Sequence, residues 1–260
     1  MSMQIQATPT RLMFEHVFDC SQSTWERARD VHRAMTSDDL RALLAQLDAF
    51  HVDYTFVQPT YGIRLHNVTV FKACTIGPQP AYVAQYAELI ARIFNYTANF
   101  RIVLCLTEQP KKLVHSRAIT MNDINSGVSL PGNTIILWRY DRDFVKLLIH
   151  ECIHLMRGER DEARTEALAL LVHSMLHART FAEFERTNAA QAHKSDELAE
   201  RVLRVDAGDT NLELYTVKGA CLLHHPDALL KGNTPDTCER VPATSHNHTD
   251  EPDEEFTVTV

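Results

Sequence analysis

The sequence predicts an α+β fold in which a small mixed sheet is accompanied by several amphipathic helices. Short apolar runs rich in β-branched residues occur at 63–71, 101–106 and 134–138, as expected for strands. Longer segments carry apolar residues at helical spacing, most clearly at 142–157 and 161–178. The chain has 260 residues, which is enough to bury a core in one large domain or in two small ones.

Residues 1–120 are expected to form an N-terminal α/β lobe, either as a separate domain or as part of the same fold. Leucines at helical spacing predict a helix at 36–50. Strands are expected at 54–57 and 63–71, and a helix at 80–96 follows a Gly-Pro-Gln-Pro breaker. The lobe contains no motif that indicates a function.

A His-Glu-x-x-His motif occupies residues 150–154, inside an apolar segment of helical character. On an α-helix, His150 and His154 lie one turn apart on the same face. Two imidazoles placed in this way can bind one Zn²⁺ ion at about 2.0–2.1 Å. Glu151 lies at the edge of that face, where it can hold a water molecule next to the metal and accept its proton. The motif therefore predicts a catalytic zinc site.

A five-residue pattern can occur by chance in a chain with 14 histidines. The residues around the motif strengthen the interpretation. Asp141 is a candidate N-cap, and Gly158 follows the last apolar residues as a candidate C-cap glycine. We therefore expect the motif helix at about 142–157. The alternative is a buried helix whose two histidines make ordinary hydrogen bonds.

The motif and the acidic segment after it resemble the zincin metallopeptidases. Arg157 and Arg160 occupy the positions at which the metzincin branch has a glycine and a third histidine, so the resemblance is not to that branch. The segment 161–167, Asp-Glu-Ala-Arg-Thr-Glu-Ala, is similar to the glutamate-bearing helix of the gluzincin branch. The resemblance implies a compact zincin-like fold, with an active-site helix followed by a glutamate-bearing helix in a catalytic core at 121–231.

The third zinc ligand is predicted on this second helix. The resemblance implies Glu162 as the ligand and Glu166 as a partner that orients a histidine ligand. If the chain reverses near Gly158, simple hairpin geometry favours Glu166 as the ligand instead, so it stays the alternate. The helix macrodipole offers another explanation for Glu162, because acidic residues are favoured in a first helical turn, but it does not account for Glu166.

A strand near the metal is expected to bind substrate. In zincins an edge strand pairs with an extended peptide, and residues 125–130 and 134–138 are the candidates for this edge. The alternative is that each is an ordinary sheet strand. Tyr215, His224 and His225 are candidates for stabilising the oxyanion.

The charge distribution separates the body of the chain from its last residues. The net charge is −8, and residues 232–260 contribute seven acidic residues and one arginine. We expect this polar, acidic segment to be a disordered tail. The rest of the chain is nearly neutral, which predicts no nucleic-acid partner and no membrane partner.

The cysteines and the first residues suggest a cytoplasmic or nuclear protein. The N-terminus lacks the features of a secretory signal, and no stretch approaches 18 apolar residues. Six cysteines are scattered without a Cys-x-x-Cys pair, and we expect all of them to be reduced thiols: Cys20, Cys74, Cys105, Cys152, Cys221 and Cys238.

Together these observations predict a zinc metallopeptidase with a peptide or protein substrate. Zn²⁺ would be bound by His150, His154 and Glu162, and Glu151 would be the general base. Two alternatives remain open: a binding or scaffold protein with a vestigial or structural zinc site, and a zinc hydrolase of non-peptide amides.

Overall fold

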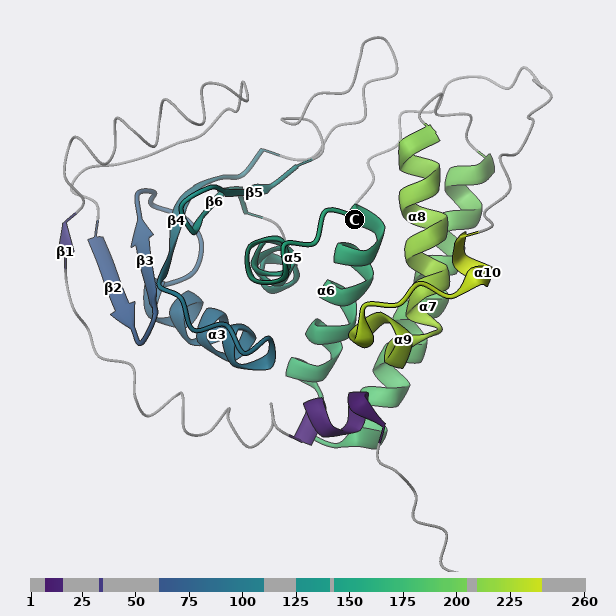
Figure 1. Ribbon diagram of the computed structural model, residues 1–260. Helices are drawn as coiled ribbons and strands as arrows, with labels where there is room; N and C mark the ends of the chain where they lie inside the picture. Colours follow the sequence, from purple (N-terminus) through teal and green to yellow (C-terminus); the bar gives the residue numbers. More distant parts are fainter. Residues whose placement is uncertain are drawn as a thin grey trace, which may run out of the picture. The chain divides into compact units, whose positions relative to one another are not determined.

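The protein is described by a computed structural model that covers residues 8–15, 33–34, 61–109, 125–140, 143–204 and 210–239. Its contacts divide the chain into two compact units (Figure 1). Unit 1 comprises Met1–Gln22 and Arg157–Thr249, and unit 2 comprises Ser23–Met156 and Asp250–Val260. The expected boundary at residue 120 falls in the segment 110–124, outside the described residues, and stays a prediction.

Unit 2 contains a six-stranded sheet with the strand order β1-β2-β3-β4-β6-β5. Three neighbouring strands, β3, β4 and β6, run parallel to one another, whereas the pairs β1–β2, β2–β3 and β5–β6 are antiparallel. The strands are β1 (Arg33–Ala34), β2 (Tyr61–Leu65), β3 (Val68–Lys72), β4 (Phe100–Thr107), β5 (Gly127–Leu130) and β6 (Thr134–Arg139). The predicted α+β class with a small mixed sheet is therefore confirmed.

The segment predicted as one strand at 63–71 is in fact a β-hairpin. A two-residue turn at His66 and Asn67 separates β2 from β3, and Leu65 pairs with Val68. His66 adopts a φ of 50°, in the left-handed region that tight hairpin turns require. The Asn67 side-chain amide donates hydrogen bonds at 3.1 Å to two carbonyl oxygens of the segment 96–98, which hold the turn in place.

The strands β4 and β6 lie inside the sheet, and both of their faces are buried. On one face Phe71, Val103 and Trp138 belong to a single hydrophobic cluster. On the opposite face Leu104 pairs with Leu137, and both are fully buried. Burial on both faces explains why these strands are continuous apolar runs in the sequence rather than alternating ones.

The helix α3 (Pro80–Ile93) connects the parallel strands β3 and β4 and packs against β2 and β3. Pro80 is at the start of the helix, where its missing N–H costs no hydrogen bond. The helix ends at Ile93 rather than at 96 as expected, and Asn95 follows with a φ of 52°.

Unit 1 is helical in the part that the structure describes. Its helices are α6 (Glu162–His177), α7 (Phe181–Arg204), α8 (Thr210–Leu223), α9 (Pro226–Lys231) and α10 (Asp236–Glu239). The helix α8 packs against both α6 and α7. Phe14, in a short helical segment at 9–15, stacks on Phe184 of α7 with ring centroids 5.9 Å apart. None of the helices in these described ranges is long and apolar enough to cross a membrane.

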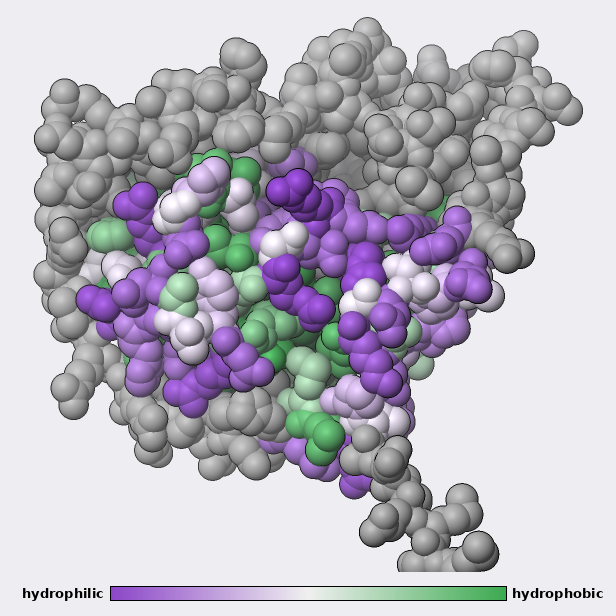
Figure 2. Space-filling model, viewed as in Figure 1, coloured by the Kyte–Doolittle hydropathy of each residue, from purple (hydrophilic) through white to green (hydrophobic). Residues whose placement is uncertain are grey.

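The first part of the predicted tail at 232–260 is folded, which corrects the prediction for residues 232–239. Residues 232–239 include α10, and Cys238 on this helix is fully buried. The remainder of the predicted tail, 240–260, lies outside the described residues. Hydrophilic residues predominate over α9 and α10 on the face drawn in Figure 2, in agreement with the exposed side chains of Lys231, Asp236 and Glu239.

The prediction that all six cysteines are reduced is wrong for one pair. Cys221 and Cys238 form a disulfide, with Cα atoms 5.6 Å apart. Cys74, Cys105 and Cys152 are free and buried. Burial raises the pKa of Cys74, and it raises the pKa of Cys105 to about 12, so both thiols remain protonated at neutral pH as core residues. Cys20 lies outside the described residues.

Candidate metal centre

The His-Glu-x-x-His motif lies on α5 (Phe144–Arg157), as predicted. The helix buries one apolar face, whose residues include Phe144, Leu148 and Ile149. It ends before Gly158, whose φ of +64° identifies the predicted C-cap glycine. The predicted N-cap, Asp141, lies outside the described residues.

The two motif histidines point their rings at a common position. The Nε2 atoms of His150 and His154 are 3.1 Å apart, and the ring planes are inclined by 70°. Two ligand atoms at about 2.0–2.1 Å from a tetrahedral zinc ion lie about 3.3 Å apart. The pair is therefore arranged as two imidazole ligands of one ion would be. The same distance also suits a hydrogen bond between two neutral imidazoles, which is the alternative that the sequence left open.

The carboxylate of Glu151 lies between α5 and strand β5. Glu151 is only 5% exposed. The Ser129 hydroxyl of β5 donates a hydrogen bond to the Glu151 backbone carbonyl at 2.6 Å and lies 3.2 Å from its carboxylate oxygen Oε2. These contacts hold the motif glutamate beside strand β5. In the sequence Glu151 directly follows His150.

Gly127 leaves the space that the Glu151 side chain occupies. A Cβ atom at position 127 would lie 2.9 Å from Glu151 Cγ and 3.1 Å from Oε1, and 2.6 Å from a methyl carbon of Leu137. Real Cβ atoms essentially never come within 3.0 Å of another heavy atom, so the contacts with Leu137 and with Glu151 Cγ would force a shift. The sequence analysis missed both Gly127 and Ser129, although a glycine inside a strand can indicate such a close approach.

Strand β5 is the edge of the sheet on this side. The strand order places β6 between β4 and β5, and no described strand pairs with the outer side of β5. Of the two predicted edge candidates, 125–130 therefore contains the edge strand, whereas the prediction for 134–138 is wrong. The reason is that β6 uses both of its sides for pairing, parallel to β4 and antiparallel to β5.

The two predicted acidic ligands lie on α6 in unit 1. Glu162 is the first residue of this helix and is exposed, and Glu166 follows one turn later and is half-buried. Asp161 precedes them as the N-cap: its Oδ1 accepts hydrogen bonds from the backbone N–H groups of Ala163 and Arg164 at 3.0 and 3.3 Å. Its Oδ2 accepts one from Lys218 at 2.6 Å. Asp161 thereby determines that the helix begins at Glu162.

Within unit 1, the side chains of Cys221, His225 and Cys238 lie close enough together to hold a metal ion. Within unit 2, His150 and His154 supply two of the three predicted zinc ligands. The third ligand, Glu162 or its alternate Glu166, stays a prediction.

A partly buried ion pair stabilises the chain just before α6. The Arg164 guanidinium donates to Glu159 Oε2 at 2.9 Å, and its Nη1 donates to the Gly232 carbonyl at 2.9 Å and to the Thr234 hydroxyl at 3.0 Å. Burial alone would raise the pKa of Glu159, but hydrogen bonds from the Asp161 backbone and from Arg164 outweigh it and lower the pKa.

This arrangement predicts that Glu159→Gln destabilises the protein at neutral pH and not in acid. The folded pKa of Glu159 is depressed, so its contribution is complete above the unfolded value of about 4.3 and is lost as the pH falls through the folded value. We expect a loss of about 1.5–3 kcal/mol at pH 7, the range for hydrogen bonds to a charged group.

Urea unfolding of wild type and Glu159→Gln across this pH range measures the difference. The exposed Glu185 on α7 provides the control, since Glu185→Gln should change the free energy of unfolding little at any pH. A difference between wild type and Glu159→Gln that stays constant down to acid pH would contradict the prediction.

Comparisons with family models, with curated proteins and with solved structures found no match for this chain. The resemblance to zincins therefore depends on the motif helix and its flanking residues, and the zincin-like arrangement of the whole fold stays a prediction.

Proposed function

We propose that this chain is a zinc-dependent metallopeptidase whose active site is built on α5. The observation that carries the proposal is the 3.1 Å separation of the His150 and His154 Nε2 atoms. This separation suits two ligands of one tetrahedral ion. Glu151, which directly follows His150, is buried. The helical spacing of the motif predicts that the two rings share a face, and the structure adds the distance between their Nε2 atoms.

The proposed roles follow from the chemistry of the side chains. His150 and His154 would hold Zn²⁺, with Glu162, the ligand that the sequence predicts, as the third ligand. When bound, zinc lowers the pKa of water toward neutrality and polarises a carbonyl group. Glu151 accepts a proton from the attacking water and delivers it to the leaving amine. Ser129 holds the Glu151 backbone, and thereby keeps the carboxylate beside β5.

The edge position of β5 favours a peptide as the substrate. An extended peptide can add to a sheet edge through main-chain hydrogen bonds, which require no particular side chain. Glu151 lies against Gly127 and Ser129 of this strand. A peptide paired with β5 would therefore run past the general base, whereas a small non-peptide amide would gain little from a strand edge.

Metal analysis of the wild type and three variants tests the site and identifies its third ligand. We expect about one zinc per chain in the wild type with the Cys221–Cys238 disulfide intact, and a loss in Glu162→Ala but not in Glu166→Ala. Glu185→Ala serves as the control for an exposed acidic residue outside the site. Loss in Glu166→Ala alone would assign that residue as the ligand instead. Wild type that binds no zinc even after reconstitution would refute the proposal.

A further inference from the structure

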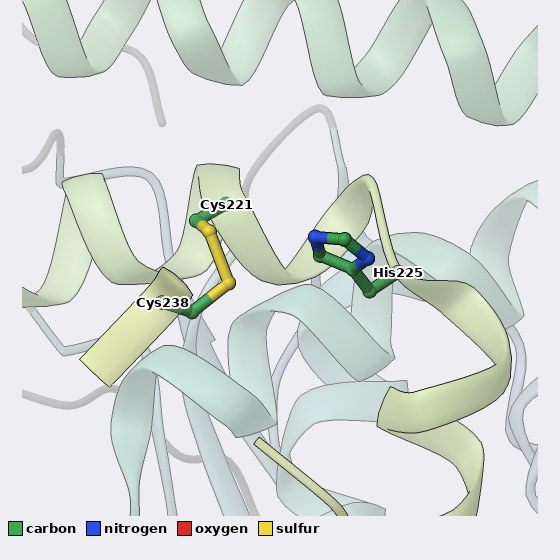
Figure 3. A group of neighbouring side chains, drawn as sticks. All are labelled: Cys221, His225 and Cys238. Carbon is green, nitrogen blue, oxygen red and sulfur yellow. A yellow bond between two sulfur atoms is a disulfide. The ribbon is translucent and has the colours of Figure 1, made fainter. Parts of the chain in front are cut away.

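A second group of possible metal ligands lies entirely within unit 1, away from the motif in the sequence. Cys221 comes from α8, His225 from the junction between α8 and α9, and Cys238 from α10. Each of the three residues offers one ligand atom, and these three atoms all lie within 4.8 Å of one another. Figure 3 shows the His225 ring beside the bond that joins the two sulfur atoms.

Backbone hydrogen bonds hold His225 in this position. Its N–H donates to the Leu222 carbonyl at 2.9 Å, and its own carbonyl accepts from the Leu229 N–H at 3.0 Å. Pro226 follows as the first residue of α9, where its restricted φ favours the start of a helix. The histidine therefore sits at a well-defined junction between two helices rather than in a loose loop.

The third member, Cys238, is brought to the group by α10. The helix α10 contacts α8, and the Cys238 N–H donates to the Pro235 carbonyl at 2.8 Å. Cys238 is fully buried, Cys221 is half-buried and His225 is exposed. The group is therefore shielded from solvent at Cys238 and accessible to solvent at His225.

Two cysteines and one histidine make a donor set that suits zinc. Thiolate and imidazole are preferred zinc ligands, and four-coordinate zinc leaves one position for water or another ligand. Two thiolates also neutralise the charge of a divalent ion, so little net charge would be left at the half-buried site. The oxidised pair cannot bind in this way, because the sulfur atoms of a disulfide carry no thiolate charge.

We propose that Cys221, His225 and Cys238 form a redox-controlled site for a zinc-like divalent cation. In the reduced chain the two thiols lose their protons and bind the ion together with the His225 imidazole. In the oxidised chain the Cys221–Cys238 bond replaces the ion. This inference does not depend on the function proposed for α5.

The exchange between the two states balances with a small-molecule disulfide as the oxidant. The Cys221 thiolate, which is the more accessible of the two, attacks the small disulfide and forms a mixed disulfide, releasing one thiolate. The Cys238 thiolate then attacks the Cys221 sulfur, forming the intramolecular bond and releasing the second thiolate. The two released thiolates take up two protons, and the divalent ion leaves.

Cobalt provides a direct measurement, because thiolate ligands give Co²⁺ a charge-transfer absorption that nitrogen and oxygen ligands do not. The full chain is reduced, freed of metal and titrated with Co²⁺ under anaerobic conditions. We expect the final intensity of this absorption to correspond to one cobalt ion bound by thiolates per chain, and the absorption to disappear when oxidised glutathione is added. The α5 site offers only histidine and glutamate ligands, so cobalt bound there would add to the total uptake but not to the intensity of this absorption.

Two variants at neighbouring histidines make the test specific. We expect His225→Ala to weaken cobalt binding by about tenfold or more, since loss even of an outer-shell partner typically costs 10–100-fold in metal affinity. His224→Ala is the matched control, because His224 is also exposed but contacts Asp196 at 2.9 Å. Both variants keep Cys221 and Cys238, so the test does not require a cysteine variant to fold.

Two results would overturn the proposal. One is a reduced wild type that shows no thiolate-to-cobalt absorption. The other is equal cobalt affinity in His225→Ala and His224→Ala. In either case Cys221 and Cys238 would form a structural disulfide only, which stabilises the fold by closing a loop around α9.

Discussion

Replacement of Glu151 by glutamine is expected to leave zinc bound and to lower kcat for peptide hydrolysis by about 10²–10⁴-fold, the usual contribution of a general base. Glutamine has nearly the same shape as glutamate but cannot accept a proton from water. Glu151 is the proposed general base and not one of the proposed ligands, so the metal content should not change. Peptide-library cleavage followed by kcat and KM measurement on the best substrate, together with zinc analysis, provides the test.

The control for Glu151→Gln is a second buried glutamate in the same unit. Glu88 on α3 is also 5% exposed, and it pairs with Arg92 at 2.7 Å. Glu88→Gln removes a buried charge far from the motif in the sequence and should leave kcat unchanged for the folded protein. Full hydrolytic activity in Glu151→Gln would mean that another group accepts the proton, and the proposed mechanism would be wrong.

His150→Ala is expected to lose both zinc and hydrolytic activity. Removing one of two chelating imidazoles leaves His154 without its partner at 3.1 Å, and metal affinity depends on both. Zinc that binds only the folded state stabilises it by about 2.7 kcal/mol when its free concentration is 100 times Kd. A chelator should therefore lower the Tm of wild type and have almost no effect on His150→Ala.

The control for His150→Ala is His193→Ala. His193 is exposed on α7, where it contacts Glu197 at 3.6 Å. This variant should keep its zinc, its activity and the chelator-dependent change in Tm. If His150→Ala still bound one zinc per chain with the Cys221–Cys238 disulfide intact, His150 and His154 would be a hydrogen-bonded pair rather than ligands.

Local sequence patterns were enough to predict the helices and strands that carry most of the candidate site. The spacing of Phe144, Leu148 and the later apolar residues predicted the motif helix, and Gly158 predicted its end. The second helix was expected at 161–178 and is found at Glu162–His177. Periodicity and capping act over a few residues, so they can be seen in the sequence without knowledge of the fold.

The hairpin at His66 shows where local patterns fail. The run 63–71 is apolar enough to suggest one strand, and the turn inside it contains no glycine. The turn is stabilised by contacts of Asn67 with residues about 30 positions later in the chain. Such contacts depend on the completed sheet, and hydrophobic periodicity does not record them.

The sequence by itself determined the motif helix and placed His150 and His154 on one face of it, because both outcomes depend on residues a few positions apart. The tertiary structure decided that β5 rather than β6 is the edge strand, and that Gly127 makes room for Glu151. It also decided that Cys221 meets Cys238. Each of these outcomes requires two segments distant in the chain to approach each other, and strand order and helix packing control that approach.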